Sequence, residues 1–175
     1  LGLDTGEIEE WQSQSKATFE AKCWNEKLQM YTSYDLRAEK QIEMREIGGL
    51  IPVFAEIPTA EKAAKLRDYL MDLHHKGYYL CPSFDVEHEA FDSCRYWRGP
   101  VWPHMNWMLY HGFNAYDMQD VAAVLKADTL EVVDQFGFFE YYEPQKDLAK
   151  SLRKAYGGTH FSWTASSVID FIHNP

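Results

Sequence analysis

The 175-residue sequence lacks the apolar runs that would place it in or across a membrane. No segment approaches the roughly 18 consecutive apolar residues that a membrane-spanning helix needs. The N-terminal stretch LGLDTGEIEEWQSQS has neither a basic region nor an apolar core, so it does not resemble a secretory signal. Because 46% of the residues are hydrophobic, the composition excludes disorder. We therefore expect a soluble, cytoplasmic protein with no membrane partner.

Positive charge is also scarce. The chain has 17 Lys and Arg residues against 27 Asp and Glu residues, which gives a formal net charge of −10. The basic residues are scattered, whereas a protein that binds the phosphate backbone needs them gathered into a stripe or patch. The charge pattern therefore predicts that nucleic acid is not a partner.

Cysteine is rare, and the common cofactor motifs are missing. Cys23, Cys81 and Cys94 are odd in number and form no C-x-x-C pair, which favours reduced thiols, with one disulfide plus a free thiol as the alternative. The seven histidines form no H-E-x-x-H motif and no cluster with zinc spacing. Phosphate-binding and dinucleotide-binding glycine motifs are absent too. We therefore expect neither a metal nor an organic cofactor.

Hydrophobic periodicity predicts an all-α chain with about six substantial helices, long aromatic connections and no boundary that would divide residues 1–175. We expect a hairpin-like excursion and a short strand between helices, an aromatic loop, and then a short helix or turn. In chain order, the expected elements are a helix at 4–24, the excursion at 25–44, an irregular buried helix at 47–58, helices at 59–77, 102–113 and 116–137, and a last helix at 162–173. The short strand is expected at 78–80, the aromatic loop at 138–148 and the helix or turn at 149–158.

The segment RYWRGPVWPHMNW, residues 95–107, has the chemistry of a sugar pocket. Tyr96, Trp97 and Trp102 offer flat surfaces for the apolar face of a pyranose. Arg98 supplies fixed hydrogen-bond donors for the hydroxyl rim, and Gly99 allows close approach of the backbone. The same pattern would arise in a loop before a helix whose aromatic residues only fill the core.

A second segment, FFEYYEP at 138–144, places a carboxylate among aromatic residues. Partial desolvation raises the pKa of a carboxyl group unless it finds partners, and such carboxyls serve as general acids and bases. Glu140 is thus a candidate catalytic residue, and Glu143 lies in the same loop. The alternative is a surface glutamate on a loop whose aromatic side chains point inward.

Several segments together resemble the glycoside hydrolases of family 63. YWRGPVWPHMNW resembles the hallmark of that family, and CWNEKLQMYTSYDLRAEK resembles its Trp-Asn/Asp…Tyr-x-x-x-Asp-Leu segment. IGGLIPVFA is similar to its Gly-Gly-Leu-x-Pro-Leu-Phe-Ala helix. FFEYYEP and FSWTASSVIDFI are similar to its closing segments. The order and spacing agree over about residues 20–172.

This resemblance implies an (α/α)6-barrel-type helical toroid, of which this chain carries about half. It implies that Glu140 is the general base of an inverting hydrolase, with a second carboxyl about 6.5–9.5 Å away across the substrate. Tyr96, Trp97, Arg98, Gly99 and Trp102 would line the subsite of the departing sugar, and Trp163 would close its floor. A small carbohydrate, such as an α-glucoside, an α-mannoside or a glycosyl-glycerate, would be the substrate.

The sequence departs from the family in two places. The catalytic acid is expected in a Trp- and Asp-rich loop of the N-terminal half, and this chain has no counterpart of that loop. QKDLAKSLRKAYGGTHF replaces the Thr-Gly stretch that usually follows Glu140. Residues 1–175 would thus form the C-terminal part of the catalytic domain, with large apolar helix faces at an open edge. Two alternatives stay open: a non-catalytic carbohydrate-binding or scaffold protein, and one chain of an assembled hydrolase.

Overall fold

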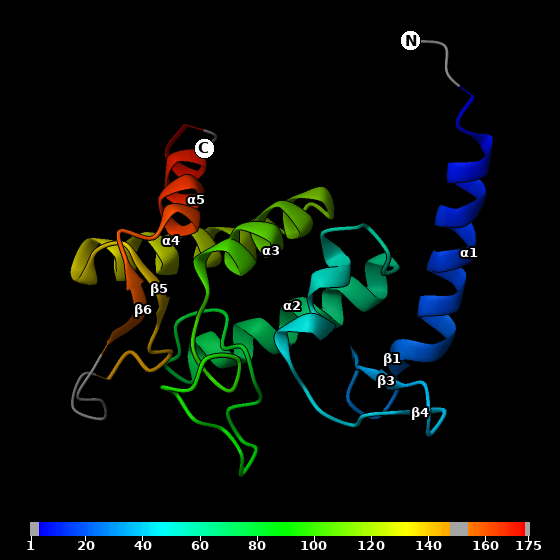
Figure 1. Ribbon diagram of the computed structural model, residues 1–175, viewed down its shortest axis with the longest axis horizontal. Coiled ribbons are helices and arrows are strands. Elements are labelled where there is room, and N and C mark those ends of the chain that lie inside the picture. The colour runs from blue at the N-terminus through cyan, green and yellow to red at the C-terminus, as the bar shows by residue number, and fades with distance from the viewer. Residues whose placement is uncertain (1–3, 148–153, 174–175) are drawn as a thin grey trace.

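The computed structural model describes residues 4–147 and 154–173, and five α-helices dominate it (Figure 1). Two consecutive 3-10 turns stand where the short, irregular sixth helix is expected. The α-helices are α1 (Gly6–Cys23), α2 (Ala60–His75), α3 (Pro103–Ala115), α4 (Gln119–Phe136) and α5 (Ser162–His173), and the 3-10 turns are η1 (Ile47–Gly49) and η2 (Ile51–Val53). None of the described helices has the length and apolar composition needed to cross a membrane.

Helix α2 forms where the sequence predicts it. The Thr59 side chain accepts a hydrogen bond from the backbone N–H of Lys62 at 3.3 Å and so caps the helix. Leu66, Leu70 and Leu73 recur at helical spacing and are buried. The segment 59–77 is thus confirmed as an amphipathic helix with its apolar stripe facing the core.

The main packing unit consists of α3, α4 and α5. Pro103 occupies the first position of α3, where the missing N–H leaves no intrahelical bond unmade. Leu109 and Phe113 of α3 are fully buried with Leu125 of α4 and Phe171 of α5. Figure 1 shows α5 rising from the region where α3 and α4 lie side by side. This unit fixes the segments that enter α3 and α5.

Two helices leave apolar surface uncovered. Helix α1 has no buried residue and lies at the edge of the molecule, away from α3, α4 and α5 (Figure 1). On α5, Ile169 and Ile172 are 59% and 63% exposed. Helix α5 thus leaves apolar side chains uncovered.

The region after α4 corrects the sequence-based interpretation. Residues 139–142 do not lie in a loop, and residues 155–158 are not part of a helix or turn, because β5 (Phe139–Tyr142) pairs antiparallel with β6 (Ala155–Thr159). Aromatic residues favour strands, and two adjacent glycines disfavour a helix. The rest of the expected helix or turn, up to residue 153, lies outside the described residues.

Two other expectations concern short strands. The excursion at 25–44 consists of two antiparallel pairs, β1 (Trp24–Asn25) with β2 (Met30–Tyr31) and β3 (Tyr34–Asp35) with β4 (Lys40–Gln41). The expected strand at 78–80 is a single bridge between Tyr78 and Gln145. The first of these hairpins packs against the core through Met30 and Tyr31, which are both buried.

Candidate active site

The two sequence motifs meet through backbone hydrogen bonds. The N–H of Val101 donates to the Tyr142 carbonyl at 2.8 Å, and the N–H of Tyr142 donates back to the Val101 carbonyl at 2.9 Å. Pro82 and Val101 form a further isolated antiparallel β-bridge. Residues 95–107 and 138–144, far apart in sequence, are thus held together close to the start of α3.

An aromatic cluster of Tyr96, Trp97, Trp102 and Tyr141 lies at this junction. Trp102 is stacked between Trp97, with ring centroids 4.1 Å apart, and Tyr141, with centroids 4.8 Å apart. Tyr96 packs edge-on against Trp102 and Tyr141. Trp102 is only 1% exposed, whereas Trp97 is 40% and Tyr96 50% exposed. The structure therefore puts Trp102 behind the other rings, and Trp97 and Tyr96 carry the accessible surface.

Arg98 and Gly99 both hold the loop in shape. Arg98 donates from Nε and Nη2 to the Ala90 carbonyl, at 3.0 and 2.7 Å. A Cβ atom at Gly99 would lie 2.8 Å from the carbonyl carbon of Asp92 and 2.9 Å from Cα of Ser93. The group that approaches Gly99 closely is therefore the backbone of Asp92 and Ser93.

Of the two glutamates in the second motif, Glu140 is the accessible one. Its side chain is half-buried on β5, and its Oε2 accepts a hydrogen bond from the N–H of Gly158 at 3.2 Å. Glu143 is only 2% exposed, and its Oε1 accepts from the N–H of Gln145 at 3.2 Å. A base that must reach a water molecule on a substrate needs an accessible oxygen, which favours Glu140.

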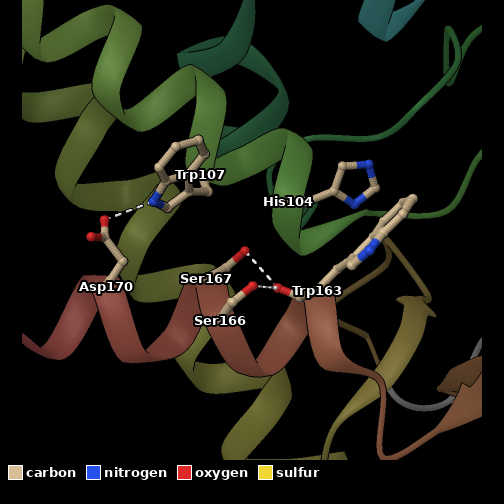
Figure 2. A pocket seen from close by; sticks show the side chains of 6 residues that line it. All are labelled: His104, Trp107, Trp163, Ser166, Ser167 and Asp170. Atoms are coloured by element: carbon tan, nitrogen blue, oxygen red, sulfur yellow. Dashed lines mark hydrogen bonds between the residues drawn. The ribbon is translucent and has the colours of Figure 1, made fainter.

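A pocket of about 390 Å³ opens between α3 and α5 (Figure 2). Trp163 and His104 pack edge-on at one end of it, with ring centroids 4.9 Å apart. At the other end, the Nε1–H of Trp107 donates to Asp170 Oδ2 at 2.7 Å, and His111 Nε2 lies 2.9 Å from the same oxygen. The full lining consists of His104, Trp107, Trp163, Ser166, Ser167 and Asp170. Most of the pocket is apolar, with a polar group at one end.

His104 connects this pocket to Glu140. Burial lowers the pKa of His104 below its ordinary 6.5, and Glu140 lies near enough for its negative charge to act in the opposite direction. The ring also packs edge-on against Trp102 at 5.6 Å. The structure therefore brings Glu140, Trp163 and the aromatic cluster to the same region around His104.

The lowered pKa of His104 predicts how stability changes with pH. Between the folded pKa and 6.5, the unfolded chain binds more protons than the folded one, so the free energy of unfolding falls as the pH falls. We expect His104→Gln to lose less stability than the wild type between pH 7 and pH 5. Urea unfolding at both pH values measures this, and an unchanged pH dependence in the variant would contradict it.

Trp163 is the one lining residue that the sequence predicted as part of the site. His104 and Trp107, three residues apart on α3, were not predicted, nor were Ser166, Ser167 and Asp170, which share one face of α5 with Trp163. Helical spacing from Trp163 could have identified the α5 residues. No pattern in the sequence shows that α3 and α5 face each other. Within the described residues, no group of three or more His, Cys, Asp and Glu could hold a metal ion.

Known proteins share this chain's sequence and fold. The family described as "Mannosylglycerate hydrolase MGH1-like glycoside hydrolase domain" matches residues 1–164. A mannosylglycerate hydrolase from Thermus thermophilus is 38% identical over 169 residues, which cover 97% of this chain and 39% of the relative. Mannosylglycerate hydrolase MGH1 from Selaginella moellendorffii is 30% identical, over 97% of this chain and 33% of the relative.

Solved structures agree with the fold. The GH63 mannosylglycerate hydrolase from Thermus thermophilus in complex with glucose superposes with a TM-score of 0.88 at 37% identity, covering 98% of this chain and 41% of that one. The neutral trehalase Nth1 from Saccharomyces cerevisiae, at 17% identity and a TM-score of 0.71, shares the fold over 94% of this chain and 30% of that one. Both are (α/α)-barrel-type enzymes, and residues 4–147 and 154–173 of this chain do not form the full barrel.

These similarities extend over almost the whole chain, but they cover well under half of the relatives. The family match includes both motifs that meet at the candidate site, residues 95–107 and 138–144. The chain therefore belongs to the family of mannosylglycerate hydrolase MGH1-like glycoside hydrolases.

Proposed function

We propose that this chain is the C-terminal part of an inverting glycoside hydrolase that acts on a small α-glucoside or α-mannoside, such as a glycosyl-glycerate. The observation that carries the proposal is the half-buried Glu140 carboxylate at the junction of the aromatic cluster and the pocket between α3 and α5. The relatives named as mannosylglycerate and glucosylglycerate hydrolases support the substrate class.

In the proposed reaction, Glu140 takes a proton from a water molecule as that water attacks the anomeric carbon. The bond from this carbon to the glycosidic oxygen breaks, and the departing oxygen takes a proton from a carboxylic acid on the opposite face of the sugar. The acid lies on a part of the enzyme outside this chain. Glu140 thus gains one proton and the acid loses one, and the new hydroxyl on the anomeric carbon has the inverted configuration.

The aromatic residues have separate roles in this proposal. Trp97, Tyr96 and Trp163 offer exposed ring faces to the sugar, because their side chains are between 40% and 56% exposed. Trp102 fixes the position of Trp97 by stacking on it. Arg98 and Gly99 shape the loop that carries both. The sugar-binding surface thus depends on residues that touch the ligand and on residues that hold them.

A non-catalytic carbohydrate-binding protein is the second candidate function. It would use the same exposed rings, and only one of the two carboxylates that inversion needs is assigned on this chain. Release of the free sugar distinguishes the two functions. Sugar-dependent tryptophan fluorescence without any released monosaccharide, measured with glycosyl-glycerates on the natural protein that contains this chain, would favour binding alone.

Truncation of Trp163 should weaken sugar binding. We expect Trp163→Ala to raise KM about tenfold, the equivalent of about 1.4 kcal/mol, because Trp163 lines the pocket and in the proposed complex its ring covers the apolar face of the sugar. Trp11→Ala is a matched control, since Trp11 on α1 is 57% exposed and Trp163 is 56% exposed. Steady-state kinetics on a glycosyl-glycerate measure both. Equal KM values in the two variants would remove Trp163 from the binding surface.

A further inference from the structure

The hairpin that carries Glu140 is irregular at that residue. Phe139 pairs with Thr159 and Tyr141 pairs with Tyr156, so Glu140 alone on β5 faces both Gly157 and Gly158 on β6. Two residues opposite one define a β-bulge, and bulges beside active sites change the direction of a side chain.

The bulge leaves space that only glycine can leave. Gly157 has φ +75°, and a Cβ atom there would lie 2.6 Å from Cβ and 3.0 Å from Cδ of Glu140. The Glu140 side chain therefore lies directly against the Gly157 backbone. Any side chain at Gly157 would push the carboxylate away from its present position.

The same bulge supplies a hydrogen bond to the carboxylate. The N–H of Gly158 donates to Glu140 Oε2 at 3.2 Å. In a regular ladder, the N–H groups that face the partner strand bond to backbone carbonyls. Here the extra residue turns one of them toward a side chain, so the backbone of β6 contacts Glu140 on one side and donates a hydrogen bond to it.

We propose that the Gly157–Gly158 bulge positions the Glu140 carboxylate for proton transfer, which makes both glycines positioning residues of the reaction. This inference rests on the proposed function, in which Glu140 acts as the base. A base must lie within hydrogen-bond reach of the attacking water, and a displacement of about 1 Å can reduce the rate about 100-fold. Ground-state sugar binding depends on the aromatic residues and is unaffected by the bulge.

The chain offers a control for backbone strain. Gly137 has φ +88°, close to that of Gly157, but a Cβ atom there would have no neighbour within 4 Å. Gly137→Ala therefore places a side chain at positive φ, as Gly157→Ala does, but without a clash. Gly157→Asn reduces the backbone strain but keeps the clash, because asparagine tolerates a positive φ better than alanine does but also carries a Cβ atom.

The experiment measures kcat, KM and sugar-dependent tryptophan fluorescence in the natural protein that contains this chain, with a glycosyl-glycerate as substrate. We expect Gly157→Ala and Gly157→Asn each to lower kcat about 10- to 100-fold, with KM and the fluorescence response within about threefold of the wild type. We expect Gly137→Ala to retain its kcat. The retained fluorescence response shows that the variants are folded.

Any of the following results would overturn the inference. If Gly157→Asn restores kcat, or if Gly137→Ala loses as much, strain accounts for the effect and the position of Glu140 does not. If the loss appears only in KM, the bulge shapes sugar binding instead. Glu140→Gln in the same assay tests the proposed function separately: an inactive Glu140→Gln beside a fully active Gly157→Ala refutes the bulge inference alone.

Discussion

Replacing Glu140 by glutamine should nearly abolish turnover while the sugar still binds. Glutamine has the same size and can accept the Gly158 hydrogen bond, but it cannot take a proton from water. We expect kcat to fall about 100- to 10,000-fold, the usual contribution of a general base. Measurement of kcat with a glycosyl-glycerate and of sugar-dependent tryptophan fluorescence tests both parts. Near-wild-type turnover would show that Glu140 is not the base.

Glu143→Gln is the matched control for this prediction. The two glutamates are three residues apart, but Glu143 is buried and bonded within its own loop. We expect this variant to keep most of its kcat, because glutamine can still accept the Gln145 hydrogen bond. If Glu143→Gln loses activity and Glu140→Gln does not, the roles of the two carboxylates are reversed.

Chemical rescue distinguishes a lost base from a damaged pocket. Azide is a nucleophile that carries no proton to remove, so it can attack the anomeric carbon in Glu140→Ala without a base. The rescued product of an inverting enzyme would be a glycosyl azide with the configuration opposite to that of the substrate. A product of retained configuration would contradict the inverting mechanism.

Much of the fold could be predicted from local sequence. Thr59 with the stripe Leu66, Leu70 and Leu73 specifies α2, and Pro103 marks the start of α3. Each signal lies within or next to the helix that it specifies. The hairpin of β5 and β6 was missed because its pairing joins residues separated by up to 20 positions in the sequence, such as Phe139 and Thr159. Strand pairs of this kind depend on tertiary contacts rather than on local periodicity.

The candidate site, like the fold, could be predicted from the sequence only in part. The aromatic residues of the first motif and Glu140 could be selected from their types and neighbours alone. Which of these residues are exposed and which are buried could not be predicted, since Trp102 and Trp97 look alike in sequence but are 1% and 40% exposed. His104 was missed because its importance comes from the facing Trp163 on another helix. Residue type identifies candidate chemistry, whereas tertiary packing decides which group faces the ligand.

The segments behind the site depend on one buried carboxylate of α4. Asp128 has a side chain that is 4% exposed, and its Oδ2 accepts from the N–H of Leu80 at 2.8 Å. Its Oδ1 accepts from Lys146 Nζ at 2.7 Å. Leu80 lies two residues before Pro82, which bridges to the first motif, and Lys146 follows the motif that contains Glu140. Asp128 thus ties both site segments to the core.

Asp128→Ala should therefore be among the most destabilising single changes in the chain. It leaves the Lys146 ammonium and the Leu80 N–H partly buried without their acceptor, and breaking a buried pair in this way costs about 3–5 kcal/mol. Asp134→Ala, at an exposed position of the same helix, should change stability by less than about 0.5 kcal/mol. Urea unfolding of both variants measures the difference, and similar midpoints would show that Asp128 does not anchor these segments.

Lys146→Met should give a smaller loss whose size depends on pH. Burial already raises the pKa of Asp128, and the lysine opposes that effect, so its removal raises the pKa further. The folded variant then keeps a proton on Asp128 at pH values where the unfolded chain, with a pKa near 3.8, has lost it. Because the folded state binds more protons, the free energy of unfolding of Lys146→Met should fall, relative to the wild type, as the pH rises from 4 toward 7. A deficit that does not change with pH would mean that Lys146 contributes packing over the Tyr79 ring rather than charge.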